Sequence, residues 1–329
     1  MVTEQSLKTF SETSEKIFQE LSKDVIGHQT VLENVVIAMI AGGNVLLEGV
    51  PGIGKTRMVR SIGRVFGLPF SRIQFTPDLM PADVTGTNVI EKDDTGRAVY
   101  KFQPGPIFSS IVLADEINRA TPKTQSALLE AMEEHKVSVA GQDYPLQEPF
   151  FVLATQNPIE QEGTYTLPEA QIDRFMMKLV LSFPTVEELS GIIKMTQKTM
   201  KETAGQVLDA DTLLLMRANA REIPITDELV DYAMRLISST HGDSEVAGET
   251  AIKYLRLGAS PRAGQALITA AKVRSLLHGK YNVSYDDINT LAYPVLRHRV
   301  RLNFDAISEH KTEDQIISAL LEELKKAKR

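Results

Sequence analysis

The sequence contains no cysteine, which excludes disulfide bonds and thiolate metal sites. Its six histidines are dispersed and form no H-x-x-H or H-x-x-x-H pair, so each one is expected to be an ordinary surface or core imidazole. No internal repeat or low-complexity tract is present. Nothing in these absences suggests an oxidising compartment or a histidine metal site.

A membrane-spanning segment is also lacking. The first twenty residues are polar and acidic and contain no apolar core of a signal peptide. The longest apolar run, residues 35–47, is interrupted by Gly42-Gly43-Asn44 and is too short to cross a bilayer. We therefore expect a soluble cytoplasmic protein.

Basic charge is in the minority, with a net charge of −7 and a pI near 5.5. This balance argues against a general nucleic-acid binder, although a local basic groove is compatible with it. The length of 329 residues suits two domains, and an apolar content of 43% suffices for a substantial core.

One stretch carries a complete motif. Residues 49–56, GVPGIGKT, fit G-x-x-x-x-G-K-[ST] between an apolar run and a helical pattern. Glycines let several backbone N–H groups turn toward phosphate oxygens, and the following helix presents its positive end to the same anion. Lys55 is then expected to reach the β- and γ-phosphates, and the Thr56 hydroxyl to bind Mg²⁺. A plain glycine-rich turn is the weaker alternative.

Strands and helices alternate through the first half of the chain. Apolar runs predict strands over 44–48, 72–75, 109–115, 150–155 and 177–182, and apolar periodicity predicts helices over 4–22, 29–41, 55–66, 122–135 and 168–174. Two β-hairpins are expected, one around 93–96 and one turning at 141–143. This order predicts an α/β fold, a P-loop NTPase αβα sandwich with a five-stranded parallel sheet.

Helical patterns follow one another after Ser182-Phe183-Pro184. Thr185 with Glu188 and Ser284 with Asp287 have the spacing of capping boxes, Thr226 caps a helix over 227–239, and Ser260-Pro261 opens another. We predict an αβα nucleotide-binding domain over 1–183 and an all-α lid domain over 184–329.

Polar residues follow two of the predicted strands. Asp115 and Glu116 end the run 111–116, where Asp115 is expected to hold Mg²⁺ and its waters, and Glu116 to orient or deprotonate an attacking water. Asn157 ends the next strand and, if that strand lies between the two others, would contact water and γ-phosphate. Solvated acids and an ordinary Asn-Pro turn are the plain alternatives.

Two arginines also attract attention. Arg174 follows Asp173, which predicts either a surface ion pair or an arginine finger that reaches a neighbouring subunit's nucleotide. Arg262 lies in the first turn of a lid helix, where the helix dipole disfavours a cation unless an anion binds there. We therefore expect Arg262 to contact a phosphate where the two domains meet, rather than to be solvated.

Taken together, six segments resemble the motifs of AAA+ ATPases in their usual order, and in particular those of the MoxR family. They are DVIG at 24–27, GVPGIGKT at 49–56, LADEINRA at 113–120, ATQNP at 154–158, LPEAQIDRF at 167–175 and GASPRA at 258–263. The two hairpins resemble the helix-2 insert and the pre-sensor hairpin of the branch shared with magnesium-chelatase ATPase subunits.

The resemblance implies a role for each matching residue. Lys55 and Thr56 belong to Walker A, Asp115 and Glu116 to Walker B, and Asn157 is sensor 1. Arg174 is the arginine finger, Arg262 is sensor 2, and Arg119 acts at the subunit interface. The residues expected around the nucleotide are Val25, Ile26, Gly27, Pro51, Gly52, Ile53, Gly54, Lys55, Thr56 and Arg57.

The resemblance further implies ATP and Mg²⁺ as cofactors and a homo-oligomeric ring, expected to be a hexamer. MoxR-like proteins are thought to mature client enzymes or insert their cofactors, often with a partner that carries a von Willebrand factor A-type domain. A nucleic-acid motor and an ATP-gated assembly switch stay open as alternatives. A GTPase is disfavoured because no guanine-reading N-K-x-D segment is present.

Overall fold

The computed structural model describes residues 4–50, 52–92, 94, 96–158, 163–197 and 203–327. Pro51, one of the residues expected around the nucleotide, lies outside the described residues, as do two residues of the predicted turn at 93–96.

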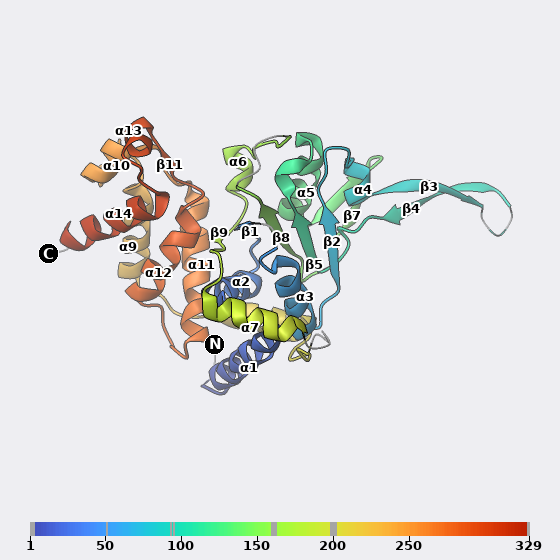
Figure 1. The fold of residues 1–329 in the computed structure, drawn as a ribbon, viewed down its shortest axis with the longest axis horizontal. Coiled ribbons are helices and arrows are strands. Elements are labelled where there is room, and N and C mark those ends of the chain that lie inside the picture. Colours follow the sequence, from blue (N-terminus) through green and yellow to red (C-terminus); the bar gives the residue numbers. More distant parts are fainter. Residues whose placement is uncertain are drawn as a thin grey trace.

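A parallel sheet of five strands forms the centre of the N-terminal half (Figure 1). Its strands are β1 (Val45–Glu48), β2 (Phe70–Gln74), β5 (Ile111–Asp115), β8 (Phe151–Gln156) and β9 (Met177–Val180). They lie in the order β2-β5-β8-β1-β9, and every pair is parallel. Strand β5 is buried along its whole length, as expected for a sheet that is covered on both faces. The predicted five-stranded parallel sheet is confirmed.

Helices cover both faces of this sheet. The helices α1 (Glu4–Asp24), α2 (Gln29–Ala41) and α3 (Lys55–Val65) share one hydrophobic cluster with strand residues such as Val45 and Leu113. Alternate strand residues, such as Leu46 and Val112, form a second cluster with α5 (Pro122–Glu134). Successive side chains of a strand point to opposite faces, so the two clusters mark the two outer layers of an αβα sandwich.

Two hairpins extend from this core. The strands β3 (Gly86–Lys92) and β4 (Ala98–Pro104) form a long ribbon that projects from the body (Figure 1). The strands β6 (Lys136–Val139) and β7 (Gln142–Pro145) form the second hairpin. Its turn was predicted one residue too late: Ala140 and Gly141 occupy it, both with positive φ, the conformation that a two-residue hairpin turn requires. The short helices are α4 (Pro81–Thr85), α6 (Glu169–Ile172) and the 3₁₀ turn η1 (Ile117–Arg119).

The C-terminal part is helical, as predicted. Its helices are α7 (Val186–Gln197), α8 (Ala210–Arg221), α9 (Asp227–Ser238), α10 (Glu249–Tyr254), α11 (Pro261–Leu277), α12 (Tyr285–Leu296), α13 (Phe304–Ser308) and α14 (Glu313–Ala327). The caps predicted at Thr185, Thr226 and Ser284 are formed. One addition was not expected, a small antiparallel pair of β10 (Leu255–Leu257) with β11 (Arg301–Leu302).

The helical lid packs against the sandwich. Helix α11 lies against α1 and α2, and α12 lies against β9. Val36 and Leu267 belong to one hydrophobic cluster, so the lid and the sandwich share buried apolar surface. The division at residue 183 stays a prediction. Within the described ranges, no helix is long and apolar enough to cross a bilayer.

Candidate nucleotide site

The phosphate loop follows β1 and opens toward free space. Gly52 and Gly54 have φ values of 83° and 88°, which side-chain-bearing residues rarely adopt. A Cβ atom added at either position would meet no atom within 4 Å, so this backbone can be approached closely from outside. Among the described residues no side chain caps α3, which begins at Lys55, and its first N–H groups are available to an anion.

Lys55 is held inside this loop. Its Nζ atom donates to the backbone oxygen of Gly49 at 2.8 Å. Burial lowers the pKa of Lys55, while the charges of Asp115 and Glu116 oppose that shift. The two carboxylates thus favour the charged form of the ammonium group.

Asp115 ends β5 and is nearly buried. Arg72 of β2 donates to its Oδ2 atom from Nε at 3.1 Å and from Nη2 at 2.6 Å. Thr155 of β8 donates its hydroxyl to Oδ1 at 2.6 Å and accepts the backbone N–H of Glu116 at 2.9 Å. The carboxylate is thus fixed by both neighbouring strands.

Glu116 has a left-handed backbone, with φ 58° and ψ 48°, which is unusual for a residue with a side chain. Its Oε2 atom accepts from Gln74 Nε2 at 2.8 Å and from Arg119 Nη1 at 3.1 Å. Arg119, expected at a subunit interface, therefore contacts the catalytic candidate of its own chain. The turn directs Glu116 away from the course of the strand toward these two groups.

Asn157 follows β8 directly and is buried, with 5% of its surface exposed. Since β8 lies between β5 and β1, Asn157 follows a strand between the one that ends in Asp115 and the one that leads into the phosphate loop. The sequence required that the strand before Asn157 lie between the two others, and β8 lies between β5 and β1.

An apolar cavity of about 260 Å³ adjoins the phosphate loop. Its lining includes Val25, Ile26, Gly52, Ile53, Gly54, Arg57, Met58 and, from α7, Leu189, Ile192 and Met195. Two lining residues carry buried nitrogen atoms without a hydrogen-bond partner among the described residues, Arg57 Nη1 and His28 Nε2. A cavity that is apolar with a few unpaired polar nitrogen atoms fits a heteroaromatic base.

Gly27 lies in the turn between α1 and α2, and its contact with a nucleotide stays a prediction. It lines a neighbouring cavity together with Val25 and is absent from the lining of the apolar one. Its φ is 76°, and an added Cβ would lie 2.5 Å from Glu188 Oε1. The positive φ of the turn therefore favours glycine at this position.

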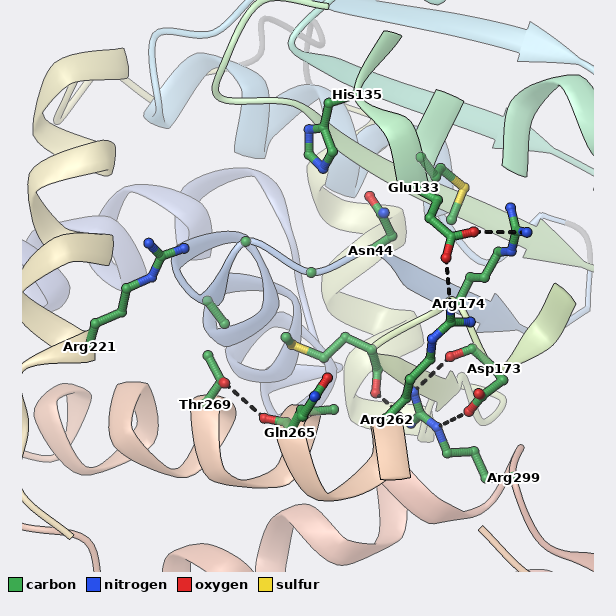
Figure 2. A pocket seen from close by; sticks show the side chains of 16 residues that line it. Asn44, Glu133, His135, Asp173, Arg174, Arg221, Arg262, Gln265, Thr269 and Arg299 are labelled. Carbon is green, nitrogen blue, oxygen red and sulfur yellow. Dashed lines mark hydrogen bonds and ion pairs between the residues drawn. The ribbon is translucent and has the colours of Figure 1, made fainter. Parts of the chain in front are cut away.

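Arg174 and Arg262 lie in a separate cavity of about 380 Å³, which is also lined by Gly43 and Asn44 (Figure 2). Both guanidinium groups pair with Glu133 of α5, Arg174 at 2.8 Å and Arg262 at 2.5 Å. Gly43 and Asn44 precede β1, whereas the phosphate loop follows it. The structure therefore does not bring these two arginines to the phosphate loop of their own chain. The carboxylate of Glu133 lies at the start of α11 in this structure, and the phosphate contact of Arg262 stays a prediction.

Several contacting residues were missed from the sequence, namely Arg72, Gln74, Thr155, His28 and Glu133. Gln74 and Thr155 lie at strand ends beside Asp115, so the strand order would have indicated them. Nothing in the sequence pattern of α5 singles out Glu133, because its partners come from other segments.

The loop and the carboxylates fit a nucleoside triphosphate with Mg²⁺. Among the described residues, no group of three or more His, Cys, Asp or Glu could hold a metal ion. Mg²⁺ is commonly bound by one or two protein oxygens together with phosphates and water, an arrangement that Thr56 and Asp115 could supply.

Comparisons with known proteins agree with this geometry. A family model described as "ATPase family associated with various cellular activities (AAA)" matches residues 44–177, and an "AAA lid domain" model matches 250–320. "Chaperone MoxR1" of Mycobacterium tuberculosis is 39% identical over 310 residues, 94% of this chain and 81% of that protein. "Protein MoxR" of Methylorubrum extorquens is 28% identical over 90% of each chain.

A solved structure is similar as well. The crystal structure of a proposed ATPase from Cytophaga hutchinsonii has a TM-score of 0.90 and 37% identity, covering 97% of this chain and 96% of the other. The two family models match in the order of the sandwich and the lid. The protein belongs to the MoxR family of AAA+ ATPases.

Proposed function

We propose that this protein hydrolyses ATP with Mg²⁺ and that each active site is completed by a neighbouring copy of the same chain. One observation carries the second half of the proposal. Arg174 and Arg262 share Glu133 beside the residues that precede β1, while Lys55 and Thr56 follow β1. The four residues of β1 span about 13 Å between its two ends. Two arginines on the far edge of a protomer are suited to a neighbour's phosphates.

The roles of the residues follow from their chemistry. Lys55 and the N–H groups at the start of α3 bind phosphate oxygens, and Val25 and Ile26 receive the base. Thr56 and Asp115 would hold Mg²⁺, which, when bound, offsets phosphate charge. Glu116 orients the attacking water and accepts its proton, and Asn157 fixes that water without adding charge.

Release of Arg174 from Glu133 is part of the proposal. The two side chains are about one-third exposed, and an ion pair of this exposure contributes only ~0–1 kcal/mol. A γ-phosphate presented by a neighbour, with its larger charge, competes well with such a pair. Arg174 then stabilises the charge that develops in the transition state.

The biological role is proposed from the relatives. We propose that ATP turnover remodels or matures a client protein, because one relative is named a chaperone. A ring of six subunits, a partner with a von Willebrand factor A-type domain and a cytoplasmic location belong to the same proposal.

The experiment measures Mg-dependent phosphate release by the wild type and by Glu116→Gln, together with ATP binding and self-association. Wild type should turn over ATP and associate further when ATP is added, while Glu116→Gln binds ATP and stays inactive. If wild type shows no turnover in any state of association, the ATPase function is excluded.

A further inference from the structure

Arg299, which follows α12, is a buried arginine whose donors are all used. Its exposed fraction is 6%, and burial lowers its pKa against the opposing effect of Asp173. Nε donates to Asp173 Oδ1 at 2.7 Å, Nη1 to the backbone oxygens of Met176 and Val295, and Nη2 to those of Asp173 and Phe175. A guanidinium has five N–H donors, so this set satisfies every one.

These contacts surround Arg174. Asp173 and Phe175 are its neighbours in the chain, and Nη2 of Arg299 binds both of their carbonyl groups, at 3.0 and 2.7 Å. His298 Nε2 contacts the same oxygen of Phe175 at 3.0 Å. The backbone on either side of Arg174 is thus fixed by a side chain from the lid.

The same carboxylate connects this segment to Arg262. Asp173 accepts the hydroxyl of Ser260 at 2.7 and 2.9 Å. Ser260 is the N-cap of α11, and Arg262 is in the first turn of that helix. Figure 2 shows Arg299 and Arg262 on the lid side of the cavity with Asp173 and Arg174 opposite them. The guanidinium of Arg299 and the carboxylate of Asp173 therefore fix the backbone from which the side chains of Arg174 and Arg262 extend.

We propose that Arg299 is a positioning residue, which holds the 173–176 segment so that Arg174 can reach a neighbour's nucleotide. The inference rests on the proposed function, in which Arg174 acts in the adjoining subunit. Only an arginine can make this set of contacts, because a lysine ammonium cannot offer a planar fork to several oxygens at once. The position of the lid in one subunit then determines turnover in the next.

The test compares Arg299→Lys with Arg297→Lys. Arg297 is a matched control, since it also joins the lid to the sandwich, donating to the backbone oxygen of Lys178 at 3.1 Å. Its hydrogen bonds within the described part of the chain go to Lys178 and Asp314, and none goes to the 173–176 segment. We expect Arg299→Lys to bind ATP within about twofold of wild type and to lose roughly 10- to 100-fold in kcat. Arg297→Lys should keep a kcat within about threefold of wild type.

Mixed assemblies separate positioning from a general structural defect. A Glu116→Gln subunit has an intact Arg174, so mixing it with Arg299→Lys should restore turnover at the Arg299→Lys nucleotide sites. A mixture of Arg299→Lys with Arg174→Ala should show no more turnover than Arg299→Lys alone, because neither supplies a well-placed Arg174. Restoration by the first partner alone is the expected result.

Two results would overturn the inference. The first is a kcat of Arg299→Lys equal to that of wild type. The second is a loss of turnover that mixing with Glu116→Gln does not restore, although the same mixing restores the turnover of Arg174→Ala. If Arg174→Ala is not restored either, the proposed action in trans fails and takes the inference with it. Should Arg299→Lys fail to fold, Asp173→Asn serves in its place. Asp173→Asn keeps the contacts of Arg299 with the backbone carbonyl groups. It should therefore show a smaller loss of turnover, which mixing with Glu116→Gln restores. An Asp173→Asn variant without such a loss would overturn the inference.

Discussion

The hydroxyl of Thr155 donates to Asp115 at 2.6 Å across two neighbouring strands. The same oxygen accepts the N–H of Glu116, so one buried hydroxyl fixes both acidic residues of the site. Protein groups therefore fix the Asp115 carboxylate and the backbone of Glu116, which is what electrostatic stabilisation by a preorganised site requires.

Thr155→Val should impair turnover more than ATP binding. The substitution leaves the buried N–H of Glu116 without its partner, which should lower the free energy of unfolding by about 1–3 kcal/mol. We expect kcat to fall roughly 10-fold or more, because Glu116 loses its fixed backbone. Steady-state kinetics and urea denaturation measure the two effects. Thr155→Ser keeps the hydroxyl and should behave like wild type; a Thr155→Val protein with normal kcat would contradict the assignment.

Gly54→Ala tests the phosphate cradle. Its φ of 88° is unfavourable for alanine by about 1–2 kcal/mol, and the new methyl group would occupy the open space above the loop. We expect ATP affinity to fall at least roughly 10-fold in a fluorescent-nucleotide titration. Gly96→Ala is the control, since Gly96 has a φ of 81° and equally open surroundings but lies in the β3–β4 hairpin. Equal ATP affinities of Gly54→Ala and Gly96→Ala would contradict a phosphate-binding role of the loop at Gly54.

Lys55→Ala and Arg174→Ala should separate binding from hydrolysis. Without its ammonium group, Lys55→Ala loses phosphate contacts and should show little ATP binding in calorimetry. Arg174→Ala keeps its own loop, so ATP should bind normally while kcat falls by about 10³-fold or more, as expected for an arginine finger. An Arg174→Ala variant with weakened binding and unchanged kcat would instead indicate a structural ion pair with Glu133.

We expect acid to lower the stability of the protein through His298. Burial and the nearby charge of Arg299 keep the pKa of His298 well below its ordinary value, and its Nδ1 atom is buried without a partner among the described residues. Above pH 6.5 the folded and unfolded states are both neutral at this position, so it adds no pH dependence. Below that pH the unfolded chain takes up the proton first, and stability falls by up to about 1.4 kcal/mol per pH unit.

His298→Gln isolates this effect, since a glutamine amide can still donate to Phe175 without titrating. Urea denaturation between pH 5 and 7 should show a shallower loss of stability for His298→Gln than for wild type. Parallel curves would mean that another group, such as His28, whose pKa burial also lowers, causes the acid dependence.

Much of the sandwich could be predicted because its signals are local. Short runs with several apolar residues indicated the strands, and Thr185, Thr226 and Ser284 marked helix starts through contacts within a few residues. Pattern alone could not show that the turn of the second hairpin begins at Ala140, since alanine rarely adopts a positive φ.

The arrangement of the phosphate loop, Asp115 and Asn157 follows from the order of the strands. The carboxyl ends of adjacent parallel strands meet at one edge, so motifs on β1, β5 and β8 must converge there. The arginine side was not predictable, because Arg262 meets Glu133, and Arg299 meets the 173–176 segment, only through the docking of the lid. The pair of Glu133 with Arg174 joins two segments of the sandwich that are far apart in the sequence. That docking depends on buried surface spread over several helices and has no short motif.

Mixing two inactive variants shows whether one subunit completes the nucleotide site of the next. Lys55→Ala cannot bind ATP but offers an intact Arg174, and Arg174→Ala binds ATP but lacks the arginine. We expect phosphate release, which is absent from each variant alone, to return in mixtures and to peak near equal proportions. Mixtures that stay inactive at every ratio, although tagged pull-downs show that the variants assemble together, would contradict it.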